Sequence, residues 1–315
     1  MFLTLCVDTP TQNLRKFTKN DEIFNYICQK YHTIIMNILI TNDDGYQAKG
    51  IKVLTELMKK KGNVRVIAPK THQSGMSMAV SLGLKQIAYK EISNQPGEAW
   101  SYLDATPASC VKFGVNMIYQ QEKLDVVVSG INHGSNASSA SCYSGTLGAA
   151  QEGALCGILS IGVSLDNLHP DADFSAVEKF FPEIYDKILA SHSGKYGIFY
   201  NINFPSVPAE EIKGIRVGYQ GKGRWIKEFR EWNPDAFKKY GLTPEMLGQS
   251  SVPNIEEGEE LYVMVGEFLD DPNNTRLADH RLNNDGYISI VVHNLDTTDY
   301  EETELLKNAG LDADF

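Results

Sequence analysis

The sequence is poor in cysteine, and no two cysteines have the spacing of a zinc or redox motif. Its five cysteines are odd in number and form no Cys-x-x-Cys pair; they lie at positions 6, 28, 110, 142 and 156. Such a set argues against a disulfide framework and favours free thiols in a reducing compartment. We therefore expect a cytoplasmic protein.

Long apolar runs and positive charge are also scarce. No apolar run approaches the roughly 20 residues of a membrane helix, so we expect no membrane partner. The chain has 29 Lys and Arg against 40 Asp and Glu, which gives a net charge of −11. Because duplex nucleic acid is bound through Lys and Arg, this balance argues against a duplex partner. A small phosphate substrate remains compatible with it, provided that a metal ion neutralises the local field.

The common catalytic motifs are missing as well. The sequence contains no Gly-x-Ser-x-Gly nucleophile elbow, no His-Glu-x-x-His zinc motif and no Gly-x-x-x-x-Gly-Lys-Ser/Thr phosphate loop. The first expected strand is not followed by Gly-x-Gly-x-x-Gly, so a dinucleotide site has no support. Any catalytic chemistry must therefore come from residues outside these motifs.

Residues 1–35 differ in pattern from the rest of the chain. The segment 1–7 is apolar but has neither a basic region nor a small-residue cleavage site, which argues against a signal peptide. The first expected core strand begins at Met36, and the codon for this methionine is a possible translation start. We therefore expect 1–35 to be a poorly packed leader, and a chain that starts at Met36 to keep its activity and a similar melting temperature.

From Met36 onward, apolar strands alternate with amphipathic helices. Short apolar segments predict strands at 36–41, 64–69, 124–130 and 158–165, and apolar periodicity predicts helices at 50–61, 107–119 and 145–156. Strand–helix alternation with Pro and Gly punctuation predicts an α/β fold, with a mostly parallel sheet and helices on both faces. We assign residues 36–168 to this α/β core.

The pattern changes after about residue 168. We expect a helix at 176–190 and strands at 197–205, 215–219, 261–265 and 287–292, the last two as a hairpin. The polar stretch 223–249 carries five aromatic residues, Trp225, Phe229, Trp232, Phe237 and Tyr240. Aromatic anchors are typical of interfaces, although folding back on their own domain is the alternative. We expect 169–315 to complete the sheet and to form the oligomerisation arm of a homodimer or tetramer.

Two adjacent carboxylates end the first strand. Asp43 and Asp44 follow the buried run 36–41 and precede Gly45, whose backbone freedom allows a turn. Ligands bind at the carboxyl ends of strands in open α/β sheets, and two crowded carboxylates repel each other unless a cation lies between them. An Asx-type turn with an ordinary helix cap is the alternative interpretation.

Three further polar segments, 72–77, 130–136 and 142–146, follow predicted strands or open a predicted helix. With the two aspartates they bring carboxylate, hydroxyl and carboxamide oxygens to neighbouring strand ends. Hard oxygen ligands suit Mg²⁺ or Mn²⁺ and not zinc. Residues 143–146 open a helix, where free N–H groups and the positive dipole end suit an anion; simple N-capping is the alternative. His72 and His133 are left without a role.

Four ordered motifs resemble those of the SurE family, the survival-protein E nucleotidases. They are Asn42-Asp-Asp-Gly45, Ala68-Pro69 with Gln73-Ser-Gly75, Ser129-Gly-Ile-Asn132 with Gly134 and Asn136, and Tyr143-Ser-Gly-Thr146 with Gly148-Ala-Ala-x-Glu-Gly153. The resemblance runs from Met36 to about Thr298. It implies a Rossmann-like first domain, a second region that exchanges elements in a homo-oligomer, and metal-dependent phosphatase activity on nucleoside monophosphates.

The resemblance also implies the residues of the site. One divalent ion per subunit, Mg²⁺ or Mn²⁺, is expected on Asp43, Asp44, Ser74 and Asn132. Asp43 and Asp44 are then the catalytic residues, and Asp43 is the carboxylate expected to orient the attacking water or to accept its proton. Substrate is expected to bind at Asn136, Ser144, Gly145 and Thr146. The expected substrates are 5′-nucleotides, with 3′-nucleotides as a second class.

Two alternatives are kept. In one, Asp43 is the nucleophile of an aspartyl-phosphate route, although that class usually spaces its carboxylates i and i+2. In the other, the chain is a sensor that binds a metal and a nucleotide without turnover.

The sequence departs from the family pattern at 105–111, 278–279 and 291–293. At 291–293, Val-Val-His replaces a usual Thr-Pro-Leu. None of these positions belongs to the metal set.

Overall fold

The computed structural model describes residues 35–83, 86–233, 235, 243 and 254–312. The chain divides into two compact units, Met1–Ile35 and Met36–Phe315. The expected leader therefore lies outside the described residues except for Ile35, and so do Phe237 and Tyr240 of the aromatic stretch. The fold described below is that of the second unit.

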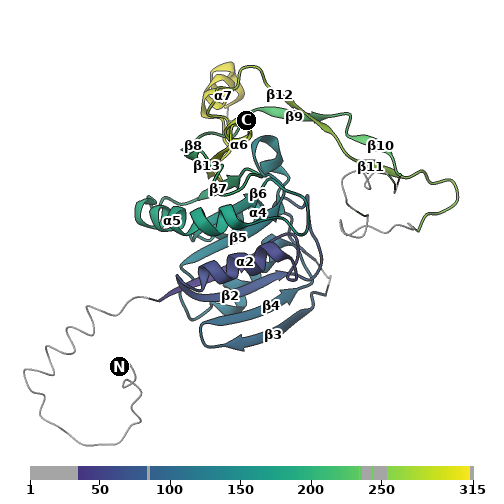
Figure 1. Cartoon of the computed structure of the whole chain (residues 1–315). Coiled ribbons are helices and arrows are strands. Elements are labelled where there is room, and N and C mark those ends of the chain that lie inside the picture. Colours follow the sequence, from purple (N-terminus) through teal and green to yellow (C-terminus); the bar gives the residue numbers. More distant parts are fainter. Residues whose placement is uncertain (1–34, 84–85, 234, 236–242, 244–253, 313–315) are drawn as a thin grey trace, which may run out of the picture. The chain divides into compact units, whose positions relative to one another are not determined.

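The second unit is built on one nine-stranded sheet (Figure 1). Its strands, in spatial order, are β3 (Tyr89–Gln95), β4 (Glu98–Leu103), β2 (Gly62–Pro69), β1 (Met36–Thr41), β5 (Val126–His133), β6 (Leu159–Leu165), β7 (Ile198–Phe204), β13 (Tyr287–Asn294) and β8 (Gly214–Val217). Neighbouring strands are parallel except at β3–β4 and β7–β13. The predicted α/β fold with a mostly parallel sheet is confirmed.

The strand order reverses next to β1. The chain places β2 and then β4 on one side of β1, and returns to place β5 on the other side. The register pairs Thr41 of β1 with Ser129 of β5, so the segments that follow these two residues emerge at the same edge. A reversal of this kind opens a crevice at the carboxyl ends of the strands, where α/β proteins bind ligands.

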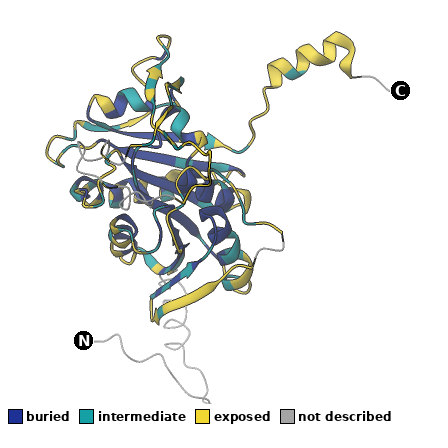
Figure 2. Ribbon diagram, turned by 90° about the vertical axis from the view of Figure 1, so that its right-hand side faces the viewer, coloured by how far each residue is buried: buried dark blue, intermediate teal, exposed yellow. Residues whose placement is uncertain are grey.

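Helices cover both faces of the sheet, as predicted. They are α2 (Lys49–Met58), α3 (Pro107–Phe113), α4 (Gly145–Leu155) and α5 (Ser175–Ser191), with α6 (Asp279–Asn284), α7 (Tyr300–Leu306) and single helical turns at Gly114–Ile118, Ser138–Cys142 and Lys307–Leu311 elsewhere. Successive strand residues point to opposite faces. In β1, Ile38 and Ile40 therefore pack with α2 and α5, whereas Leu39 packs with α3 and α4. Figure 2 shows these strands as the buried interior.

Two antiparallel ribbons extend from this unit (Figure 1). β9 (Gly223–Ile226) pairs with β12 (Glu267–Asp270), and β10 (Phe229–Glu231) pairs with β11 (Tyr262–Met264). The predicted smaller β region in the C-terminal part is confirmed, but the predicted hairpin of 261–265 with 287–292 is wrong. The apolar first half of β13 is buried between β7 and β8, so β13 joins the main sheet and β11 pairs with β10 instead.

The structure also contains elements that the sequence pattern does not predict. They include the β3–β4 hairpin, the short strands β9, β10 and β12, and the helices α6 and α7. The strand β3 is polar and almost entirely exposed, so it lacks the apolar alternation by which strands are recognised. None of the described helices is long and apolar enough to cross a membrane.

Candidate active site

The residues that follow β1, β5 and β6 line one cavity together with the start of α4. Its volume is about 570 Å³, which is within the usual size range of small-molecule sites. The predicted site residues in its lining are Asp43, Ser74, Asn132, Asn136 and Ser144. Asp44, Gly145 and Thr146 do not line the cavity but pack directly against residues that do.

The turn that presents the two aspartates is held by Asn42. Its Nδ2 donates to the Gly45 carbonyl over 3.0 Å, and its Oδ1 accepts from the Gly45 N–H over 3.2 Å. Gly45 has a φ of 95°, a conformation that side chains rarely adopt. The Asx-type turn is thus made by Asn42, and the carboxylates of Asp43 and Asp44 bond elsewhere.

Asp43 is 3% exposed, and its carboxylate faces the first turn of α4. Thr146 donates to it twice, from Oγ1 to Oδ1 over 2.6 Å and from the backbone N–H to Oδ2 over 3.2 Å. The Asp43 carbonyl accepts from the Gln73 N–H over 2.7 Å. This last bond ties the loop that carries Ser74 to the turn after β1.

Asp44 faces β5 instead. Its Oδ2 accepts a hydrogen bond from the His133 backbone N–H over 3.1 Å, and its Oδ1 lies 3.5 Å from His72 Nδ1. Its side chain is 8% exposed. The two histidines without an assigned role therefore both adjoin Asp44, one through its backbone and one through its ring.

Both carboxylates have a raised pKa. Burial, followed by the charge of Asp43, raises the pKa of Asp44 to about 8, although the His133 N–H opposes the shift. Burial also raises the pKa of Asp43 against the opposing bond from Thr146. The lining of the cavity, within the described residues, contains no Lys or Arg. A cation held between the two carboxylates would offset both the burial and the repulsion.

Neutral oxygens complete a donor set that fits such a cation. The β5–β6 register shifts between Ser129 and Asn132, an irregularity that re-aims a side chain at a strand end. Asn132 Nδ2 donates to the Gly134 carbonyl over 2.7 Å, which fixes the amide. In the described part of the chain no three His, Cys, Asp or Glu side chains gather. Two carboxylates with a hydroxyl and a carboxamide are ligands that suit Mg²⁺ or Mn²⁺.

The start of α4 lies against this set. Ser144 is the N-cap residue, and its Oγ accepts from the Leu147 N–H over 3.0 Å. Gly145 approaches Asp43 so closely that a Cβ there would lie 2.9 Å from Asp43 Cβ. The N-capping alternative therefore holds for Ser144, whereas the Thr146 hydroxyl is bonded to Asp43. The positive end of the α4 dipole is directed at the same wall of the cavity.

Asn136 is held rigidly in the loop after β5. Its backbone N–H donates to Asn203 Oδ1 and its Nδ2 donates to Ser164 Oγ, each over 2.8 Å. Its carbonyl accepts from Asn201 Nδ2 over 2.9 Å. These bonds come from β6 and β7, so the two strands fix the position of Asn136 in the cavity lining.

Other lining residues were missed by the sequence reasoning. They include Asp166, Trp225, Phe268 and His280. Asp166 directly follows β6, and burial raises its pKa, so its place at a strand end was a usable signal. Trp225 was noticed only as part of the aromatic stretch. Phe268 reaches the cavity through the pairing of β12 with β9, which no local pattern indicates.

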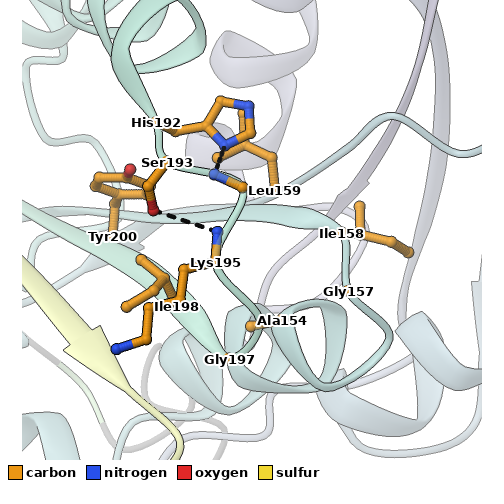
Figure 3. A pocket seen from close by; sticks show the side chains of 11 residues that line it. Ala154, Gly157, Ile158, Leu159, His192, Ser193, Lys195, Gly197, Ile198 and Tyr200 are labelled. Atoms are coloured by element: carbon orange, nitrogen blue, oxygen red, sulfur yellow. Dashed lines mark hydrogen bonds between the residues drawn. The ribbon is translucent and has the colours of Figure 1, made fainter.

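A second cavity lies at the amino ends of β6 and β7 (Figure 3). Its volume is about 40 Å³, which is far below that of a nucleotide site. His192 Nδ1 accepts from the Gly194 N–H, and Ser193 Oγ accepts from the Lys195 N–H, each over 3.2 Å. These polar atoms serve the local turn, so we place the functional site at the carboxyl ends of the strands.

Known proteins are similar to this chain in sequence and in fold. The family model "Survival protein SurE" matches residues 38–227, a range that contains the whole candidate metal set. A 5′-nucleotidase SurE from Cytophaga hutchinsonii is 37% identical over 264 residues, covering 84% of this chain and 93% of the relative. One from Christiangramia forsetii is 39% identical over 235 residues, covering 72% and 88%.

Among solved structures, the crystal structure of the SurE protein from Aquifex aeolicus superposes with a TM-score of 0.68 at 29% identity. That similarity covers 87% of this chain and 99% of the other. The sheet with its switch point, the paired aspartates and the matched family model agree with one another. The chain belongs to the SurE family.

Proposed function

We propose that this chain is a divalent-metal-dependent 5′-nucleotidase. It hydrolyses nucleoside monophosphates to a nucleoside and inorganic phosphate, and 3′-nucleotides are a second class of substrate. The observation that carries the proposal is the adjacent, buried pair Asp43 and Asp44 at the switch point. Asp43 lines a cavity whose described lining has no Lys or Arg, and Asp44 packs directly behind that lining. A phosphate monoester is an anion, so it enters such a cavity only together with a cation. Relatives that cover most of the chain are named 5′-nucleotidase.

The donor set identifies the residues that would hold the ion. They are Asp43, Asp44, Ser74 and Asn132, and Mg²⁺ or Mn²⁺ is the ion that their oxygens suit. When bound, such an ion lowers the pKa of a coordinated water and offsets the negative charge of the phosphoryl group.

The protein's own groups supply the remaining functions. Asp43 is placed to orient the attacking water or to accept its proton, because its carboxylate lies at the cavity wall beside the candidate metal ligands. Thr146 holds both of its oxygens and so acts as a positioning residue. Ser144 and Gly145 at the start of α4 would hold the phosphate near the positive dipole end, with Asn136 as a further polar contact.

Substitution of the aspartates tests this assignment. Asp43→Asn and Asp44→Asn should each reduce phosphate release from AMP by orders of magnitude at saturating Mn²⁺, because each removes a ligand charge. Both variants should stay folded, since the substitution relieves a buried repulsion. Asp186→Asn is the control, because Asp186 is 57% exposed and forms an ion pair with Lys61, just before the amino end of β2 and away from the candidate metal ligands at the carboxyl ends of the strands. Near wild-type turnover in Asp44→Asn would show that the metal set is wrong.

The two alternatives give different outcomes in the same assay. An aspartyl-phosphate route would leave acid-stable label on Asp43 after quenching with radiolabelled substrate. The structure gives it little support, because Asp43 is 3% exposed and bonded twice to Thr146. A sensor would bind Mn²⁺ and nucleotide without releasing phosphate.

The substrate range is defined by measuring the release of inorganic phosphate from a panel of 5′-nucleotides, 3′-nucleotides and polyphosphate.

We further propose the domain division and the assembly. Residues 36–168 form the catalytic core, and 169–315 complete the sheet and provide the arm of a homodimer or tetramer; 1–35 remain a proposed leader. Support comes from β7, β13 and β8, which extend the sheet, and from apolar side chains exposed on the β10–β11 ribbon. The cytoplasmic location is supported by the free thiols of Cys110, Cys142 and Cys156.

A further inference from the structure

The cavity that contains the candidate metal ligands also has an aromatic wall. Trp225, Phe268 and His280 line it together with Asp43 and Asn132. The proposed hydrolysis makes no use of these three rings. We propose that Trp225 is the surface on which the nucleobase of the substrate stacks, an inference that rests on the proposed nucleotidase function.

The three rings form a chain of contacts in which Trp225 is the outermost member. Trp225 on β9 lies directly opposite Phe268 on β12, with ring centroids 5.6 Å apart and planes inclined by 67°. Phe268 in turn lies 5.3 Å from the His280 ring, at 66°. Trp225 is 39% exposed and lines the cavity, so part of the indole is open to a ligand there. A flat ligand can therefore stack on Trp225 without displacing another side chain.

The aromatic wall is fixed in place by polar contacts behind it. His280 Nε2 lies 2.8 Å from Asp270 Oδ1, and Arg281 Nη2 lies 2.6 Å from Asp270 Oδ2. These bonds join α6 to the end of β12. A Cβ at position 223 would lie 2.3 Å from Phe268 Cζ, so Gly223 allows the Phe268 ring to lie against the β9 backbone. The wall is thus ordered before a ligand arrives, which lowers the entropic cost of stacking.

Hydrogen bonds also connect this wall to the phosphate end of the cavity. Ser138 Oγ donates to the Gly221 carbonyl over 2.7 Å, and the Ser138 N–H donates to both carboxylate oxygens of Asp279 over 3.0 Å. Residues 132–138 therefore run from the candidate metal ligand Asn132 to the base of β9 and α6. One substrate can place its phosphate at the metal set and its base at Trp225.

The chemistry of the wall determines which substrates it favours. Stacking on an aromatic face uses the π-surface that every nucleobase has, so it tolerates any base. It gives no attraction to a sugar phosphate that lacks a base. Trp225 should thus select nucleoside monophosphates of any base over phosphorylated sugars.

Two substrates with the same phosphate ester separate stacking from general damage. For AMP, Trp225→Ala should lower kcat/KM by about fivefold to a hundredfold, the loss expected for one base–aromatic stack. For ribose 5-phosphate it should leave kcat/KM unchanged. Trp225→Phe keeps a ring and should retain most of the preference for AMP. Trp232→Ala is the matched control, since Trp232 belongs to the same polar stretch, 223–249, but not to the cavity lining.

An equal loss for both substrates, or no loss for AMP, would overturn the proposal. A binding measurement gives a second test that needs no turnover. Adenosine should quench tryptophan fluorescence in the wild type and in Trp100→Phe and Trp232→Phe, but not in Trp225→Phe; quenching that survives in Trp225→Phe would also overturn it. If the wild type releases no phosphate from either substrate, the nucleotidase proposal fails, while the adenosine experiment still decides whether Trp225 stacks a base.

Discussion

Gly145 is the first residue of α4, and it lies between the helix backbone and the side chain of Asp43. An added Cβ would come within 2.9 Å of Asp43 Cβ, within 3.0 Å of Oδ2 and within 3.2 Å of the Gln73 carbonyl. All three neighbours belong to the turn or the loop that carries the candidate metal ligands. Because Thr146 donates both of its bonds to Asp43, a shift of this first helical turn also moves the carboxylate.

Gly145→Ala should therefore reduce kcat strongly. A displacement of a reacting group by about 1 Å can lower a rate about a hundredfold, and we expect a loss of that order. Gly153→Ala is the control in the same helix, because its Cβ would meet Ser160 Oγ at 2.3 Å and Val127 Cγ2 at 2.9 Å, away from Asp43. It should lower the melting temperature but keep kcat. Wild-type kcat in Gly145→Ala would show that the close approach has no catalytic role.

His293 gives a prediction for the pH dependence of stability. Burial lowers its pKa below the usual 6.5, with the charge of Asp279 opposing the shift, and its ring stacks on Phe199 at 5.0 Å. The unfolded chain therefore binds this proton more readily than the folded protein does. The contribution of neutral His293 to the free energy of unfolding is therefore fully present above about pH 6.5, and it is lost as the pH falls below that value.

His293→Phe should consequently weaken the loss of stability on acidification. The measurement is the free energy of unfolding in urea at pH 8 and pH 5, for the wild type and for the variant. The wild type should lose more stability between these two values than the variant does. His192→Gln, a substitution in the exposed loop after α5, is the control and should behave like the wild type. An unchanged pH dependence in His293→Phe would contradict the burial argument.

At the scale of elements, the predictable parts are those with a strong local pattern. β1 and β5 each contain an apolar run that is buried on both faces, and α2 shows a clear apolar stripe, so each was expected close to its observed range. The paired aspartates were expected at the site because a strand end is where a parallel sheet binds ligands. Asn132 and Ser144 were expected there because their motifs resemble those of the SurE family, and both line the cavity.

The elements and lining residues that were not predicted depend on contacts between segments far apart in the sequence. β3 is polar because one face and most of its length meet solvent, so its strand character comes only from pairing with β4. The pairing of β10 with β11 and of β9 with β12 joins residues more than thirty positions apart across the stretch after 233, where no local pattern fixes the partner. The same pairing brings Phe268 to the cavity, which is why sequence reasoning missed the aromatic wall.

An ion pair between α3 and α4 provides a test at this scale. Lys112 Nζ lies 2.8 Å from Glu152 Oε1, and the Glu152 side chain is 2% exposed. Its Oε2 has no hydrogen-bond partner among the described residues. Removing the lysine would leave a buried carboxylate without a counter-charge, which costs several kcal/mol in a fully buried pair. Lys112 itself is 43% exposed, so water offsets part of that cost.

Lys112→Met should lower the free energy of unfolding by about 2 kcal/mol. The double variant Lys112→Met/Glu152→Leu should recover most of this loss, because it removes both charges together. Lys59→Met is the control: Lys59 pairs with Glu56 and Glu98 at the surface, and its loss should cost less than about 1 kcal/mol. Urea denaturation gives the free energy of unfolding of all three variants. An equal loss of stability in Lys112→Met and Lys59→Met would contradict a special role for Glu152.

The β10–β11 ribbon carries apolar side chains that the described part of the chain leaves exposed. Phe229 lies opposite Met264, and Tyr262 lies two residues from Met264, so the three share one face of the ribbon. They are 66%, 64% and 54% exposed, respectively. Contiguous exposed apolar side chains of this kind mark interaction sites. We therefore favour burial against another subunit over folding back.

Removing residues 227–266, which include the β10–β11 ribbon, should yield a monomer with an intact candidate site. The register places Ile226 opposite Glu267, so an Asn-Gly turn can join these two residues and remove 227–266 while Trp225 and Phe268 keep their pairing. Light scattering at several concentrations should give a multiple of 35.0 kDa for the full chain and a single-chain mass for the shortened one. The triple variant Phe229→Ser/Tyr262→Ser/Met264→Ser keeps the ribbon backbone and should weaken assembly in the same direction, because it removes the apolar face alone. A single-chain mass for the full-length protein at every concentration would contradict the arm as an assembly element and favour a ribbon that packs on its own subunit.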